Sequence, residues 1–100
     1  MRHLNYYMEK NRMRKIILNG NDLVDRAKAH EYLKEMLELP EYYGKNLDAL
    51  YDCLTEMEET EVLIELTEEV SNLQPGFLNG VLRVFKEAAE ENKNLKVNII

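Results

Sequence analysis

Asp48 and Asp52 are the residues whose spacing first suggests chemistry. They stand four positions apart, so on a helix both carboxylates would lie on one face. Two neighbouring carboxylates can act as general acid and base, or hold a magnesium ion weakly. Both uses require a cleft around the carboxylates, and a helix face provides none by itself. We therefore expect neither a catalytic site nor a metal site at this pair.

Other reactive side chains are sparse. The chain has one serine (Ser71), one cysteine (Cys53) and two histidines (His3 and His30), so a nucleophile and its base would have to be brought together by the fold. Cys53 falls on an amphipathic helix, where we expect a small core residue. The four glycines are scattered, and the sequence lacks zinc or calcium spacing. The sequence predicts a protein that is not an enzyme and binds no cofactor and no metal.

The surroundings of the two aspartates favour binding instead. Like charges four residues apart weaken a helix slightly, and aspartate is a mediocre helix former. The preceding loop holds two tyrosines, and the helix face reads in order Asp48, Tyr51, Asp52 and Thr55, after Tyr42 and Tyr43. An acidic and aromatic face on a rigid element suits a basic pocket of another protein. A solvated face with half-buried tyrosines is the alternative, and these features alone leave both open.

Alternating short strands and helices are expected to position these side chains. We expect strands at 14–18, 62–66 and 95–100, helices at about 27–37, 47–55 and 77–91, and a short helical turn at 68–73. Asp22 or Asp25 would cap the first helix and Asn46 the second. Strands separated by helices need crossover connections, which predict an α/β fold, a three-stranded parallel sheet with helices packed against it.

Apolar spacing predicts which side chains face the core. The inward positions are Ala29, Leu33, Met36 and Leu37 in the first helix, Leu47, Leu50 and Leu54 in the second, and Leu78, Val81, Leu82, Phe85 and Ala89 in the last. The continuous apolar run Val62–Leu66 predicts a strand that is buried on both faces.

Length and composition predict one globular domain of a cytoplasmic protein. The 100 residues are 45% hydrophobic and 32% charged, with a single cysteine. No apolar run approaches the ~20 residues that cross a bilayer, and the N-terminus lacks the apolar stretch of a secretory signal. Residues 1–13 are expected to be an N-terminal extension that need not be ordered, and residues 14–100 the compact domain.

Charge is distributed unevenly along the chain. The net charge is −6, yet Glu38–Glu69 alone holds eleven acidic side chains against one basic side chain, Lys45. Such a segment repels nucleic acid and attracts cationic partners. An acidic surface that only keeps the protein soluble is the alternative on charge alone.

The segment Leu39–Thr55 resembles the central motif of the barstar family, the bacterial intracellular inhibitors of barnase-type ribonucleases. The match covers seventeen contiguous positions with only conservative or surface differences, and it continues at Ile16–Gly20, Val62–Glu65 and Val81–Ala88. The resemblance covers about 15–100. It implies the family's fold, a three-stranded parallel sheet with packed helices, for the domain 14–100.

The resemblance also implies a function and its residues. The second helix and the preceding loop would enter the active site of a basic extracellular ribonuclease in a 1:1 complex, and the free protein would be a monomer. By position, Asp52 would sit where a substrate phosphate binds, Asp48 would pair with an arginine at the rim, and Tyr42 would stack on the catalytic histidine. Tyr43 would pack beside Tyr42. The other implied contacts are Gly44 and Asn46, through backbone or amide groups, and Glu87, toward a second basic cluster.

Three departures from the family pattern bear on the target. Tyr51 stands where the family commonly has tryptophan, and residues 1–12 have no counterpart. The linker Glu56–Glu61 is more acidic, and Met57 within it replaces an expected aromatic. These departures bear on the identity of the partner more than on the mode of binding. The alternative function is therefore an immunity or binding protein of the same fold for a different cationic toxin or partner.

Overall fold

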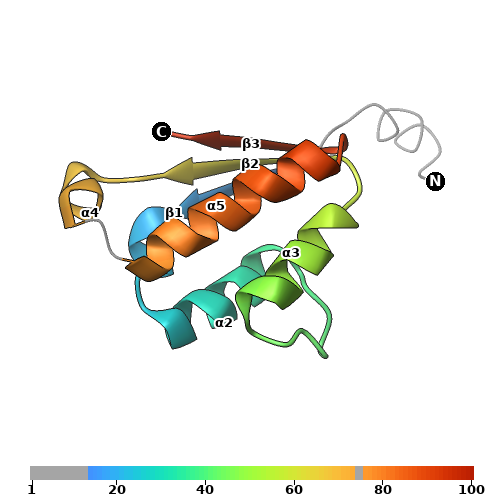
Figure 1. Ribbon diagram of the computed structural model, residues 1–100, viewed down its shortest axis with the longest axis horizontal. Coiled ribbons are helices and arrows are strands. Elements are labelled where there is room, and N and C mark those ends of the chain that lie inside the picture. Colours follow the sequence, from blue (N-terminus) through green and yellow to red (C-terminus); the bar gives the residue numbers. More distant parts are fainter. Residues whose placement is uncertain (1–13, 74–75) are drawn as a thin grey trace, which may run out of the picture.

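The computed structural model describes residues 14–73 and 76–100, arranged as a sheet with helices against it (Figure 1). The predicted N-terminal extension, residues 1–13, lies outside the described residues. In chain order the elements are β1 (Arg14–Asn19), η1 (Gly20–Leu23), α2 (Arg26–Met36), α3 (Leu47–Thr55), β2 (Thr60–Glu65), α4 (Glu68–Leu73), α5 (Gly76–Glu91) and β3 (Leu95–Ile99). Within the described ranges, no helix is both long enough and apolar enough to span a bilayer.

The three strands form one parallel sheet in the order β1-β2-β3. Ile16 pairs with Val62, and Val62 pairs with Val97. Both connections are long crossovers: α2 and α3 lie between β1 and β2, and α4 and α5 lie between β2 and β3. The predicted α/β class with a three-stranded parallel sheet is confirmed, and Asp25 is the residue that caps α2, accepting a hydrogen bond from the Lys28 N–H at 3.0 Å.

The sheet buries one face against the helices. Thr60, Val62 and Ile64 of β2 are buried, whereas Leu63 is half-buried and Glu65 is exposed. In β1, Ile17 is 55% exposed between two buried neighbours. The prediction that Val62–Leu66 is buried on both faces was wrong, because the helices of the described chain leave the alternate side chains of the central strand partly uncovered.

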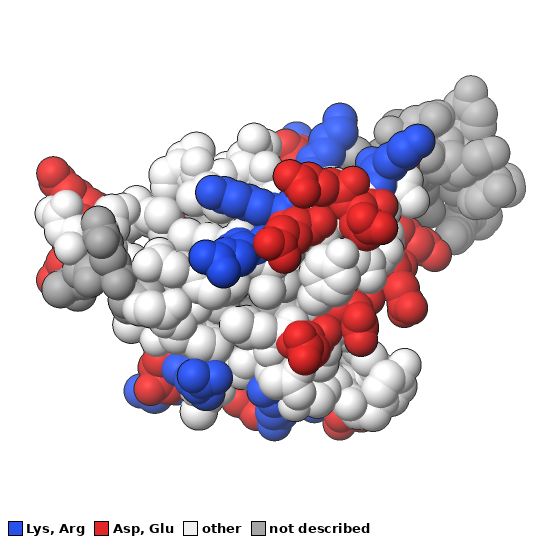
Figure 2. Space-filling model, in the orientation of Figure 1, with Lys and Arg blue, Asp and Glu red and all other residues white. Residues whose placement is uncertain are grey.

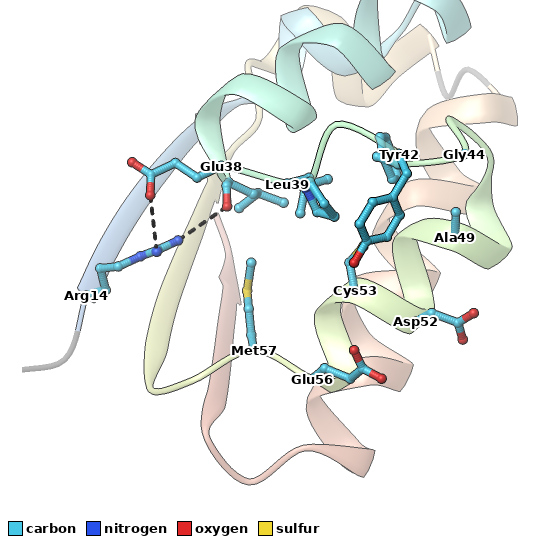
Figure 3. A pocket seen from close by; sticks show the side chains of 13 residues that line it. Arg14, Glu38, Leu39, Tyr42, Gly44, Ala49, Asp52, Cys53, Glu56 and Met57 are labelled. Carbon is cyan, nitrogen blue, oxygen red and sulfur yellow. Dashed lines mark hydrogen bonds and ion pairs between the residues drawn. The ribbon is translucent and has the colours of Figure 1, made fainter.

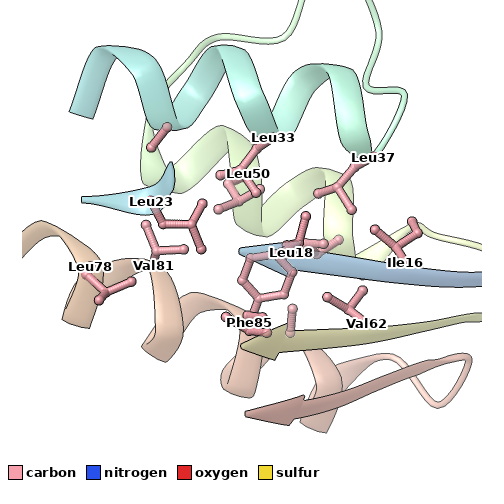
Figure 4. Close-up of a cluster of buried hydrophobic side chains, with 14 of the residues drawn as sticks. Ile16, Leu18, Leu23, Leu33, Leu37, Leu50, Val62, Leu78, Val81 and Phe85 are labelled. Carbon is pink, nitrogen blue, oxygen red and sulfur yellow. The ribbon is translucent and has the colours of Figure 1, made fainter. Parts of the chain in front are cut away.

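The core lies between this face of the sheet and helices α2, α3 and α5 (Figure 4). Phe85 is fully buried at its centre, beside Val81 of the same helix. Ala88 is buried where the sequence pointed to Ala89, which is half-buried like Leu82. Leu78, Val81, Phe85 and Ala88 together form the buried stripe of α5, and Ala89 lies at the edge of this stripe, on the side of Leu82.

The inward row of α2 also differs from the predicted one. Ala29, Leu33 and Leu37 are buried at successive i+4 positions, and His30 is buried beside them at 2% exposure. Met36, predicted to face inward, is 37% exposed because it lies on the opposite flank of that row. The core therefore takes in a histidine and leaves a methionine at the surface.

Candidate functional site

The segment Leu39–Thr55 forms a loop followed by α3, and Asn46 determines where one ends and the other begins. Its side-chain oxygen accepts a hydrogen bond from the Ala49 N–H at 2.8 Å, and its amide nitrogen donates to the Gly44 carbonyl at 3.2 Å. The first contact caps α3 as predicted, because it satisfies an otherwise unpaired N–H of the first turn. The second contact holds the loop against the start of the helix.

The leucines of α3 fix which face meets solvent. Leu50 and Leu54 are fully buried and Leu47 is partly buried. Since α3 packs against α5, the opposite face is directed outward. The predicted leucine stripe is thus confirmed, with Leu47 at its edge.

Asp48 and Asp52 lie on this outward face, and both are exposed. Neither carboxylate forms an ion pair or accepts a side-chain hydrogen bond from the described residues. Tyr51 and Thr55, on the same side of the helix, are half-buried, and the Thr55 hydroxyl donates to the Asp52 carbonyl at 2.9 Å. The carboxylates are thus available to an external cation.

The two loop tyrosines are placed in opposite environments. The Tyr42 side chain is 88% exposed, whereas that of Tyr43 is 5% exposed and belongs to the core. The Tyr43 hydroxyl lies 2.7 Å from Nδ1 of His30, and burial raises the pKa of that hydroxyl. The Tyr43 N–H also donates to the Pro40 carbonyl at 2.9 Å. Tyr43 anchors the loop, and Tyr42 is the tyrosine that the loop presents.

His30 receives Tyr43 in a closed environment. Its ring meets Phe77 of α5 edge-on at 5.5 Å, and its Nε2 is buried with no hydrogen-bond partner among the described residues. Burial, followed by the positive charges of Arg26 and Lys45, lowers the pKa of His30. A neutral His30 therefore links α2, the loop and α5.

Two ion pairs tie the same loop to α2. Lys45 pairs with Glu31, and Lys34 pairs with Glu41 at 3.4 Å. The Lys45 ammonium lowers the pKa of Glu31 through a hydrogen bond and charge attraction. Lys45 has a left-handed backbone with φ of 53°. Lys45 and Lys34 therefore pair with acidic side chains of α2 and of the loop, and not with the aspartates of α3.

The end of α3 is held by Asn92, which sequence reasoning missed. Its buried amide nitrogen donates to the carbonyls of Leu54 and Met57, at 3.0 Å each, and its oxygen accepts from the Asn94 N–H at 2.9 Å. The Leu54 carbonyl also accepts from the Met57 N–H at 3.3 Å, so the Asn92 amide adds a second contact at the helix end. The turn after α3 is thereby fixed to the connection between α5 and β3.

A groove of about 510 Å³ runs between the loop and α3 (Figure 3). Its lining residues are Arg14, Leu37, Glu38, Leu39, Pro40, Tyr42, Tyr43, Gly44, Ala49, Asp52, Cys53, Glu56 and Met57. Cys53, expected in the core, is half-buried: it packs against the core and also lines this groove. Burial, then the charges of Glu56 and Asp52, raise the pKa of the Cys53 thiol, which disfavours the nucleophilic thiolate.

Acidic side chains gather on one side of the molecule, over α3 and the C-terminal half of α5 (Figure 2). Glu87 is exposed on α5, the helix against which α3 packs. Glu56, one turn after Asp52, is exposed and lines the groove together with it, although sequence reasoning treated it only as part of a linker. Its i+4 spacing from Asp52 was the signal that would have revealed it. In the described ranges, no group of three or more His, Cys, Asp or Glu side chains could hold a metal ion.

Two comparisons with known proteins agree with one another. A family model described as "Barstar (barnase inhibitor)" matches residues 13–100 of the chain. The protein named "Putative ribonuclease inhibitor YrdF" of Bacillus subtilis (strain 168) is 44% identical over 84 residues, which are 82% of this chain and 92% of that protein.

Proposed function

The chain belongs to the barstar family, and from this premise we propose that it inhibits a secreted, basic, barnase-like ribonuclease by occupying its active site. The family match points to an inhibitor rather than an enzyme. In the proposed complex, α3 and the loop before it enter the catalytic cleft. One inhibitor binds one ribonuclease, and we propose that the inhibitor is a cytoplasmic monomer until it binds.

One observation carries the proposal: Asp48 and Asp52 face solvent from a rigid helix, beside an exposed tyrosine, and have no cationic partner among the described residues. A ribonuclease must stabilise the negative charge of a phosphate in its transition state, so its cleft is rich in cations. Fixed carboxylates can occupy that field as phosphates do, and they offer no bond to cleave. Charge-assisted hydrogen bonds would offset the cost of removing them from water.

Each residue of the candidate site then has a role. Asp52 takes the place of a substrate phosphate, and Asp48 pairs with an arginine at the rim of the cleft. Tyr42 stacks on the catalytic histidine. The supporting contacts come from Gly44 and Asn46 in the loop, Tyr51 and Thr55 on α3, and Glu87 on α5. Tyr43 acts from beneath, because its 5% exposure leaves little surface for a partner while its hydroxyl reaches His30.

The test is inhibition of barnase by the purified protein and by two matched variants. Asp52→Ala removes a carboxylate from the proposed contact, and Glu65→Ala removes one from the exposed sheet face at the end of β2. Breaking one partner of a buried ion pair costs about 3–5 kcal/mol, which corresponds to a loss of roughly 150- to 5,000-fold in affinity. We expect that loss for Asp52→Ala and little change for Glu65→Ala. Equal inhibition by both variants would refute the role given to Asp52.

A different cationic toxin is the second candidate partner. The half-buried Met57 and the exposed Glu56 that line the groove stand where the family pattern differs, which favours a partner other than barnase itself. If the wild-type protein leaves barnase active but captures a basic protein that has no nuclease activity, this second function replaces the first. The acidic surface does not suit nucleic acid in either case.

A further inference from the structure

The groove beside α3 has an apolar floor and an acidic edge. Leu39, Cys53 and Met57 are half-buried along it, while Asp52 and Glu56 are exposed on the α3 side (Figure 3). The two carboxylates are one helical turn apart, so a single cationic group between them would contact both. A groove of this kind suits a side chain with a long apolar stem and a cationic head.

The opposite end of the groove is already occupied by a cation of the chain. Arg14 lines the groove there, and its guanidinium lies 3.6 Å from the carboxylate of Glu38 and 3.5 Å from the Leu37 carbonyl. This end is therefore neutralised from within. The uncompensated negative charge of the groove is confined to the end that holds Asp52 and Glu56, which fixes the direction in which a cationic side chain would enter.

Glu56 is poorly placed for the stability of the protein alone. It is the C-cap of α3, where the helix dipole disfavours a negative charge. It also stands four residues from Asp52, and like charges at that spacing repel. Its carboxylate accepts no ion pair from the described residues. A contact outside the chain would account for a glutamate at this position.

The end of α3 is rigid enough to serve as such a contact. Asn92 binds the carbonyls of Leu54 and Met57 from the core side, at 3.0 Å each. The backbone around Glu56 is thus held by hydrogen bonds to the carbonyl of Leu54 before it and to the carbonyl of Met57 after it. A ligand in the groove would meet side chains that are already in position, which reduces the entropy lost on binding.

We infer that this groove receives one arginine side chain of the ribonuclease, with its stem on Met57 and Cys53 and its guanidinium between Asp52 and Glu56. The inference rests on the proposed function and extends it: Glu56 and Met57 select a ribonuclease with an arginine beside the phosphate site that Asp52 occupies. Arginine suits the pair better than lysine does, because its planar head presents several N–H donors at once to two carboxylates.

The test uses the full chain and butylguanidinium, which has the head group and a stem like those of arginine. The methyl resonance of Met57, assigned with Met57→Leu, is followed by NMR during the titration. We expect a saturable shift whose dissociation constant rises about two- to fivefold in Glu56→Gln, the range of a partly exposed ion pair. Glu65→Gln, with the same charge change on the sheet, should leave the dissociation constant unchanged. Butylammonium should bind more weakly, because it lacks the planar fork.

The outcomes separate this inference from the function on which it rests. An unshifted Met57 methyl, equal affinity in wild type and Glu56→Gln, or equal binding of butylammonium would each overturn the inference. Inhibition of barnase by the wild type, lost in Asp52→Ala, would at the same time leave the proposed function standing. Thermal unfolding of the free variants adds a second readout: Glu56→Gln should be at least as stable as the wild type, whereas a stabilising role for Glu56 predicts a lower Tm.

Discussion

Tyr43→Phe isolates the contact through which the core holds the proposed binding loop. The substitution removes one oxygen atom and keeps the ring that packs in the core. That oxygen lies 2.7 Å from Nδ1 of His30, whose Nε2 has no hydrogen-bond partner among the described residues. In the variant, neither ring nitrogen of this histidine, which is 2% exposed, would have a hydrogen-bond partner among the described residues.

The expected loss of stability follows from this geometry. Leaving a buried polar group without its partner costs about 1–3 kcal/mol. For a domain of this size, each kcal/mol lowers the Tm by about 4–8 °C. Tyr43→Phe should therefore lower the Tm by several degrees. If the loop loosens as well, the variant should lose more free energy of binding to the ribonuclease than free energy of unfolding.

Tyr42→Phe is the matched control, because the neighbouring tyrosine is 88% exposed and its hydroxyl forms no hydrogen bond with the described residues. Its stability should stay within about 0.5 kcal/mol of the wild type, as surface substitutions usually do. Thermal and urea unfolding of the three proteins measure the difference, and barnase inhibition measures the effect on the loop. If Tyr43→Phe and Tyr42→Phe were equally stable, the hydrogen bond to His30 would have no part in holding the loop.

Three further outcomes are expected. Because the pKa of His30 is lowered in the fold, the unfolded chain binds a proton first as the pH drops. The free energy of unfolding should therefore fall below about pH 6.5, by at most about 1.4 kcal/mol per pH unit, until the pKa of the folded state is reached. Urea unfolding should show a shallower fall with pH in His30→Gln, and the same dependence on pH in both proteins would contradict the role of His30. Asn46→Ala removes the cap of α3 and should cost about 0.5–2 kcal/mol in the same assay, whereas Asn46→Asp should retain most of the stability. The rate of association with barnase in stopped flow should fall steeply as salt rises and the Debye length shrinks to about 10 Å at 0.1 M; a flat response would mean that the acidic side of the molecule does not guide the encounter.

The periodicity of the sequence predicted the elements well and their surroundings less well. The spacing of Leu50 and Leu54 identified the buried side of α3, and Asn46 marked its first turn, because both signals are local. The partial exposure of Leu63 was not predicted, since a continuous apolar run does not reveal how many layers cover a strand. Met36 was assigned inward for a similar reason: apolar spacing alone does not show which flank of a helix meets its neighbour.

The candidate site shows the same division. That the acidic face of α3 points outward could be predicted from the leucines opposite it. The separation of Tyr42 from Tyr43 could not, because it depends on His30, thirteen residues earlier in the chain. Asn92 was missed because it acts on backbone carbonyls of Leu54 and Met57, more than thirty residues away, and such contacts leave no periodic signal.

These long-range contacts bear directly on how an acidic surface could become an inhibitor. Negative charge attracts a basic enzyme and raises the rate of encounter, but it does not by itself hold the complex together. The residence time depends on how little freedom the contact residues lose on binding. Here the loop is held by His30 and by the ion pair of Lys45 with Glu31, and the end of α3 by Asn92. The proposed contact residues therefore sit on a backbone that is already ordered, so that most of their interaction energy can go into slowing dissociation.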